Sequence, residues 1–147
     1  TGLLVSPQRM VLEPGQRRMV RVSAITARQA VDRIYRVTIK PVTGDVAADS
    51  TAIKVMVGYD VLVLYRPQAI SGDVTATRTG RTLRLHNASN TAQEVFDGKQ
   101  CDANGKDCKT LGATRLYAGA DWDQPIPYDT PVEYRITAGN GTRTVKF

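Results

Sequence analysis

Short alternating segments separated by turn residues constrain the fold of this chain most strongly. Polar and apolar residues alternate in five segments, which are residues 18–23, 33–40, 52–59, 82–86 and 132–137. Residue pairs between them, such as Pro14-Gly15 and Asn140-Gly141, are typical of turns. The only helix-like stretch, residues 26–32, is about two turns at best, and we expect a loop there. Such regularly spaced short strands predict an all-β chain made of β-sandwiches rather than strand–helix–strand units.

The 147 residues divide near Pro67. A long apolar segment ends at Arg66, and Pro67 cannot continue it as a central strand. Residues 67–147 can supply about six or seven strands, which is a complete small sandwich. Residues 1–66 supply only about four strands, and half a sandwich leaves an apolar face open to water. We therefore expect residues 1–66 to be the C-terminal part of a first domain, whose other strands are missing from this sequence or come from another chain.

The two cysteines, Cys101 and Cys108, flank a segment with Asn104-Gly105 at its centre. Asn-Gly is a strong signal for a two-residue hairpin turn, which would place the cysteines opposite each other at a distance suited to a disulfide. Counting outward from this turn puts them at a hydrogen-bonded pair, so a bulge or a longer loop stays open as an alternative. A disulfide indicates an oxidising compartment. Two thiolates without a nearby histidine make a poor zinc site, and we predict neither a metal nor a cofactor.

Charge and hydropathy argue against two classes of protein. The net charge is +6, but the basic residues are scattered and no aromatic residues are interleaved with them to stack on bases, so we do not expect a nucleic-acid-binding protein. No segment approaches the roughly 18 apolar residues that a membrane-spanning helix needs. No signal peptide is visible, so we expect either mature protein or a sequence that has lost its N-terminal part.

Catalytic signals are weak. The single histidine, His86, lies in an alternating segment without an acidic residue of matched spacing, which is typical of a surface or edge residue. Residues 121–123 place two aspartates around Trp122, a pattern that fits sugar hydrolysis. Because Pro125 follows closely, we instead expect a solvated turn with Trp122 packed inward. Residues 102–107 contain carboxylates but lack the rest of a calcium-binding loop. The sequence therefore predicts a protein that is not an enzyme.

The sequence resembles a known family, the periplasmic chaperones of the chaperone–usher pilus pathway. The segments that carry the resemblance are residues 1–7, 12–15, 19–23, 33–40 and 53–67, which are similar to the middle strands, the long final strand and the domain junction of the family's first domain. Over residues 68–147 the resemblance rests on strand pattern, length and the placement of Cys101 and Cys108, which is closer to the alternate, class 5 type. It implies two immunoglobulin-like domains, the first of which lacks about three initial strands here.

The mechanism that this resemblance implies is donor-strand complementation, in which the chaperone lends an edge strand to a pilus subunit that lacks its own last strand. Ile53, Val55 and Val57 match the family's donor positions, and they share one side of a strand. The plain alternative is that these three side chains face their own core. Against it, Met56 lies on the opposite side and can serve that core, and an exposed apolar edge would aggregate unless a partner covered it.

The resemblance also implies a charge cluster that links the two domains. Arg21, Asp32 and Arg66 match its Arg, acidic and Arg positions, whereas the plain alternative is three surface charges. The family anchors the terminal carboxylate of the subunit with basic residues, but Leu62 stands where one of them is expected. That anchor is therefore not carried over to this chain.

Taken together, the sequence predicts a periplasmic chaperone that binds, stabilises and delivers pilus subunits. Its implied partners are the subunits and an outer-membrane usher, and without them we expect self-capping homo-oligomers through the same edge. The alternative is an immunoglobulin-like adhesion or pilus structural module. Pairing of residues 53–57 with a foreign chain favours the chaperone, whereas an internal strand there favours the adhesion module.

Overall fold

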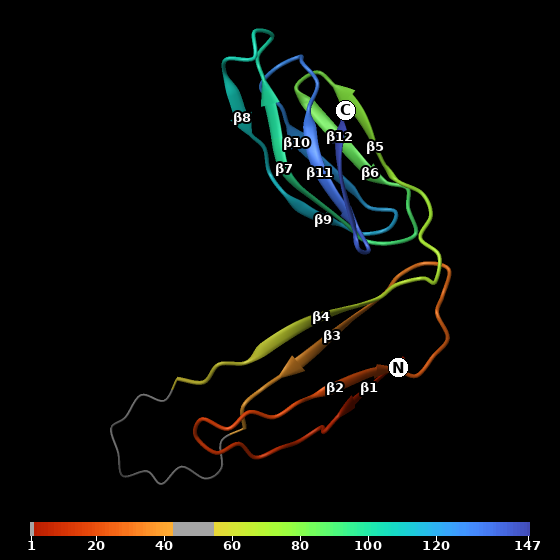
Figure 1. The fold of residues 1–147 in the computed structure, drawn as a ribbon, viewed down its shortest axis with the longest axis vertical. Helices are drawn as coiled ribbons and strands as arrows, with labels where there is room; N and C mark the ends of the chain where they lie inside the picture. Colours follow the sequence, from red (N-terminus) through yellow and green to blue (C-terminus); the bar gives the residue numbers. More distant parts are fainter. Residues whose placement is uncertain (1, 43–54) are drawn as a thin grey trace. The chain divides into compact units, whose positions relative to one another are not determined.

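The computed structural model describes residues 2–42 and 55–147, and the strands in this part of the chain run from β1 to β12 without an intervening helix (Figure 1). The all-β prediction is confirmed. The chain forms two compact units. The first unit comprises Thr1–Ala27 and Arg33–Tyr65, and the second comprises Arg28–Asp32 and Arg66–Phe147. The sequence did not indicate that the five residues from Arg28 to Asp32 leave the first unit and join the second.

The first unit contains two antiparallel strand pairs. Strand β1 (Leu3–Ser6) pairs with β2 (Arg21–Ala24), and β3 (Arg33–Ile39) pairs with β4 (Tyr59–Tyr65). Two hydrogen bonds tie the start of this unit together: the Ile25 N–H donates to the Gly2 carbonyl, and the Tyr65 hydroxyl donates to the Thr26 carbonyl. A side chain at Gly2 would overlap the Tyr35 hydroxyl, which is buried above it.

The first unit has little buried apolar interior in its described part. Every residue of the buried hydrophobic cluster belongs to the second unit. Conversely, all of the exposed large apolar side chains except Val31 and Ile70 belong to the first unit. Two strand pairs are too few to cover each other's apolar faces. The described part of the first unit therefore leaves most of its large apolar side chains exposed.

The second unit is a sandwich of two antiparallel sheets. One sheet has the order β10-β6-β5, and the other has the order β12-β11-β7-β8 with β9 also paired to β7. The strands are β5 (Val74–Thr79), β6 (Thr82–Asn87), β7 (Gln93–Cys101), β8 (Cys108–Thr110), β9 (Thr114–Leu116), β10 (Asp121–Pro125), β11 (Glu133–Ala138) and β12 (Gly141–Lys146). The inner faces meet in a core that includes Leu85, Val95 and Ile136, all fully buried. Trp122 packs edge-on against Tyr134, with 6.2 Å between ring centroids.

A β-bulge in β7 shapes this core. Lys99 pairs with Glu133 and Phe96 pairs with Arg135, so Asp97 and Gly98 together oppose Tyr134. A side chain at Gly98 would overlap the Tyr134 ring, so glycine is required there. The bulge therefore lets the Tyr134 ring enter the core, where burial raises the pKa of its hydroxyl to about 12.

The predicted disulfide between Cys101 and Cys108 is present, and the two residues are paired across β7 and β8. The predicted two-residue turn at Asn104-Gly105 is wrong, and the longer-loop alternative is right. Gly105 has a φ of +69°, whereas Asn104 does not have a positive φ. The loop is instead held by Asp102, whose carboxylate accepts hydrogen bonds from the Lys106 and Asp107 N–H groups.

Removing this disulfide should lower the free energy of unfolding of the second unit. The bridge closes a loop of roughly 8 residues, for which chain entropy gives about 2.5 kcal/mol. A Cys101→Ser/Cys108→Ser variant and the reduced wild type should therefore unfold at the same, lower urea concentration, monitored by the fluorescence of Trp122. Unfolding of the variant at the wild-type urea concentration would contradict this prediction.

Candidate functional site

An apolar strand edge on the first unit is the candidate site. Val55, Val57, Tyr59 and Val61 are 81%, 66%, 63% and 45% exposed, so exposure falls steadily along the row into β4. Within the described residues β4 pairs only with β3, so no second strand lies along its other edge. Such an edge is a template for another strand.

The predicted donor residues are placed as follows. Val55 and Val57 lie outside the core of their own unit, and Ile53 lies outside the described residues. The predicted strand over residues 52–59 is not observed in its described part, because residues 55–58 precede β4 rather than belong to it. The β3–β4 register explains this: it would place Val57 opposite Pro41, which has no N–H to donate. The residues before β4 therefore have no partner strand on the β3 side.

The donor row predicted from the sequence ends at Val57 and does not include Tyr59 and Val61. The same period of two that selected Val55 and Val57 could have extended the row, because all four are odd-numbered positions. Across the strand pair, Tyr59 is opposite the exposed Ile39 and Val61 is opposite Val37. The row and the apolar side chains opposite it on β3 thus form one wider apolar surface on the β3–β4 pair.

Of the residues predicted for a charge cluster, Asp32 and Arg66 belong to the second unit and Arg21 belongs to the first. The Asp32 carboxylate accepts a hydrogen bond of 2.6 Å from the Ala92 N–H. The Arg66 guanidinium donates to the Thr91 hydroxyl and the Ala92 carbonyl, at 2.6 and 3.0 Å. Asp32 and Arg66 thus both bind the backbone of Ala92 in the second unit. Arg21 is exposed on β2 of the first unit.

Asn90 is an attachment point that the sequence did not indicate. Its side-chain amide donates to the carbonyls of Ala30 and Ala69 and accepts from the Ser71 N–H, each at 2.9 Å. Its backbone carbonyl accepts from the Asp32 N–H. The loop between β6 and β7 therefore binds residues 28–32 and the start of the second unit. A polar run such as residues 87–91 looks like any turn in the sequence, so no local signal identified this role.

Leu62 is half-buried in β4, where the resemblance had suggested a basic residue. The residue directly opposite it on β3 is Arg36. The Arg36 guanidinium donates to the Asp60 carboxylate at 3.1 Å, and both side chains are exposed. The basic residue nearest in register to Leu62 is thus already paired within its own strand ribbon.

Comparisons with known proteins agree on the fold. No family model matches the chain, and no curated protein matches it. The crystal structure of the class 5 fimbriae chaperone CfaA has a TM-score of 0.72 at 18% sequence identity, over 99% of this chain and 72% of that one. A structure described as a chaperone–tip adhesin complex vital for synergistic activation of CFA/I fimbriae biogenesis has a TM-score of 0.67 at 18% identity, over 99% and 71%. The chain has a fimbrial chaperone fold. The predicted similarity to class 5 chaperones is confirmed for the fold.

The aspartates of residues 121–123 in this chaperone fold lie in strand β10, so the predicted turn is wrong, although Trp122 does pack inward. Asp121 lies 2.7 Å from the His86 imidazole, and Asp123 accepts two hydrogen bonds from Arg84. The sequence shows no acidic residue of matched spacing beside His86, and the acidic neighbour comes instead from β10, across the sheet. Arg84 lowers the pKa of the Asp123 carboxyl, whereas the general acid of a glycan hydrolase needs a raised pKa.

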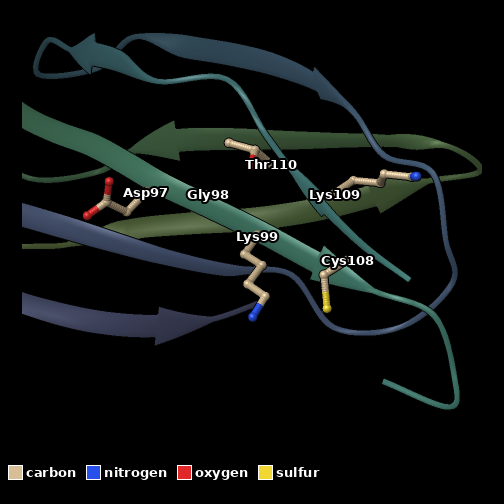
Figure 2. Close-up of a pocket in the computed structure, with 6 residues that line it drawn as sticks. All are labelled: Asp97, Gly98, Lys99, Cys108, Lys109 and Thr110. Carbon is tan, nitrogen blue, oxygen red and sulfur yellow. The ribbon is translucent and has the colours of Figure 1, made fainter. Parts of the chain in front are cut away.

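A pocket of about 270 Å³ lies on the second unit beside the β7 bulge (Figure 2). Its lining comes from β7 and β8 and consists of Asp97, Gly98, Lys99, Cys108, Lys109 and Thr110. Cys108 is held in the disulfide, Asp97 pairs with Arg135, and Lys109 pairs with Asp107. Lys109, followed by Tyr128, lowers the pKa of the Asp107 carboxyl. The pocket therefore offers no free thiol and no unpaired carboxylate for chemistry.

In the part of the chain that the structure describes, no three His, Cys, Asp or Glu side chains come together in a way that could hold a metal ion. The same residues include no helix of the length and apolarity needed to cross a membrane.

Proposed function

We propose that this protein is a periplasmic, non-enzymatic chaperone that binds pilus subunits by donor-strand complementation and delivers them to an outer-membrane usher. In this proposal residues 1–66 belong to the subunit-binding domain, and residues 67–147 form the second domain. One observation carries the proposal: Val55 and Val57 are exposed beside an unpaired strand edge, on a unit with little buried interior of its own. The fold shared with fimbrial chaperones supports the same role.

The energetics favour capture of an incomplete sandwich. Fully burying one valine or isoleucine side chain contributes about 1.5–3 kcal/mol, so Ile53, Val55 and Val57 together supply on the order of 5–9 kcal/mol before ordering costs. Backbone hydrogen bonds to the free edge of β4 add register and direction. A subunit that lacks one strand has an open apolar groove and unpaired backbone groups along it, and a donor strand would cover the groove and pair with these groups.

Coexpression with candidate pilus subunits tests this function. We expect at least one subunit to copurify with the chaperone as a one-to-one complex. Recovery of the protein without any subunit, from cells that express the full set of candidates, would count against the proposal. Binding of a ligand at the loops, with residues 53–61 buried inside the protein, would favour an adhesion module instead.

In the absence of subunits, the same edge should associate with itself. An unpaired apolar strand edge lowers its exposed area by pairing with a second copy, which gives dimers or larger assemblies. Light scattering coupled to size-exclusion chromatography should therefore show a mass that rises with protein concentration and falls when a subunit is added. A strict monomer at high concentration would contradict this expectation.

We also propose that Arg21, Asp32 and Arg66 form the charge cluster between the two domains. In support, the Oδ1 atom of Asp32 is buried without a hydrogen-bond partner among the described residues, which is costly for a carboxylate. A guanidinium that reached this oxygen would remove that cost.

A double-mutant cycle with Arg21→Gln and Asp32→Asn tests the cluster. If the two residues interact, their effects on the free energy of unfolding should be non-additive by about 1–3 kcal/mol. The same cycle with Arg17→Gln in place of Arg21→Gln is the control, because Arg17 is also an exposed arginine of the first unit. Additive effects for Arg21 and Asp32, within about 0.3–0.5 kcal/mol, would contradict the cluster.

A further inference from the structure

The segment between β1 and β2, residues 7–20, is a cationic and apolar loop that the proposed function does not use; we call it the arginine loop. It contains Arg9, Arg17 and Arg18 against one acidic residue, Glu13. All three arginines are exposed. Within residues 2–42 and 55–147, none of them makes a side-chain hydrogen bond or an ion pair. The fold of the unit therefore makes no visible use of these charges.

The arginine loop nevertheless has a defined conformation. Pro14 and Gly15 occupy the centre of a turn in which the Gln16 N–H donates to the Glu13 carbonyl at 2.9 Å, and Gly15 has the φ of +76° that this turn requires. The Gln16 side chain in turn accepts from the Glu13 N–H. The loop thus folds back on itself instead of extending as an unstructured connection.

The arginine loop borders an open hollow of about 510 Å³ with a mixed lining. Met10, Val11 and Met19 supply its apolar part, and Val11 and Met19 are 81% and 76% exposed. Arg18 supplies its charged part, and Arg21, which we have assigned to the charge cluster, also borders it. Methionine adapts to irregular apolar surfaces, and arginine binds carboxylates through paired hydrogen bonds. This combination is complementary to an apolar segment that carries acidic side chains.

The position of the loop within its unit indicates which partner can reach it. Hydrogen bonds at Gly2 and Thr26 mark one end of the first unit. Strand β1 runs away from that end and finishes at Ser6, just as β3 runs away from it and finishes at Ile39, opposite Tyr59. The arginine loop and residues 55–59 therefore lie toward the same end of the unit (Figure 1).

We propose that the arginine loop is a second contact for the captured pilus subunit, which receives an acidic, apolar segment of that subunit. This inference rests on the proposed function, because a partner that covers Val55 and Val57 is the one placed to reach the loop. Opposite charges at the rim of an interface raise the association rate and make it sensitive to salt, more than they raise affinity. The loop would thus speed capture, and the strand edge would hold the subunit.

The test is a charge reversal, Arg17→Glu/Arg18→Glu, measured as the association rate with a purified pilus subunit that copurifies with the wild type. At 50 mM NaCl we expect association about 10-fold slower than wild type. At 500 mM NaCl, where screening is much stronger, the difference should fall below about 2-fold. Arg18→Gln should give about a 2- to 3-fold reduction at low salt. The matched control, Lys99→Glu/Lys106→Glu on exposed positions of the second unit, makes the same charge change and should stay within about 2-fold of wild type.

The outcomes separate this inference from the proposed function. Wild-type association by the reversal variant at low salt, while Val57→Asp abolishes capture, would overturn the loop contact and leave the chaperone role intact. Capture that survives Val57→Asp would instead overturn the chaperone mechanism and, with it, the loop contact. An equal loss at both salt concentrations would show that charge is not the cause and would also overturn the inference. If the reversal variant loses binding to phosphatidylglycerol vesicles but associates with the subunit at the wild-type rate, the loop is a membrane contact. That result would also overturn the inference.

Discussion

Replacing Val57 by aspartate should abolish the capture of pilus subunits while residues 67–147 keep their fold. In the proposed complex the Val57 side chain enters the apolar groove of the subunit, where a carboxylate would be buried without a partner. Burying an unpaired charge costs several kcal/mol, so we expect the dissociation constant to rise by at least about 100-fold. In the free protein the same side chain is exposed, so the substitution should leave the stability of the protein close to wild type.

The measurement is recovery of the coexpressed complex, followed by titration of purified protein with the subunit. Met56→Asp is the matched control, because Met56 is the adjacent exposed residue at the alternate position and the substitution introduces the same charge. Val55→Asp should behave like Val57→Asp, and Val57→Thr should weaken binding far less. Normal recovery of the complex with both Val55→Asp and Val57→Asp would remove the donor role from this row.

Replacing Asn87 by alanine should destabilise the second unit by about 3–5 kcal/mol. Asn87 is fully buried, and its amide donates to the carbonyls of Thr91 and Leu116. Its side-chain oxygen accepts from the N–H and the hydroxyl of Ser89. Truncation would leave several of these buried groups without a partner, and each such group costs about 1–3 kcal/mol.

Urea unfolding followed by the fluorescence of Trp122 measures this effect, because the only tryptophan of the chain lies in the second unit. Asn104→Ala is the control, since Asn104 is exposed in the hairpin loop and should change the free energy of unfolding by less than about 0.5 kcal/mol. Because the loop from Asn87 to Gln93 also holds Asp32 through Asn90, the variant should in addition speed hydrogen exchange at the Asp32 amide. A loss of less than about 1 kcal/mol would contradict the buried network as the main support of this loop.

The features that could be read from the sequence are those that short-range patterns encode. Period-two alternation predicted the strand class, because successive side chains on a strand point to opposite sides whatever the strand pairs with. The spacing of Cys101 and Cys108 predicted their pairing, since any short hairpin between them brings them together. The expectation that residues 1–66 are an incomplete domain rests on the same kind of pattern, because it is a count of local elements.

The features that the sequence did not show depend on which distant strands lie side by side. A strand was predicted over residues 52–59, but residues 55–58 are not in a strand. The sequence did not show this, because Pro41 becomes the neighbour of Val57 only through the β3–β4 register. His86 acquires Asp121 only because β10 pairs with β6 over a separation of 35 residues. Asn90 binds residues 28–32 across about 60 positions of sequence, and nothing local distinguishes it from an ordinary turn residue. Local alternation sets which side of a strand is apolar, whereas the neighbour of each strand is a property of the assembled sheets.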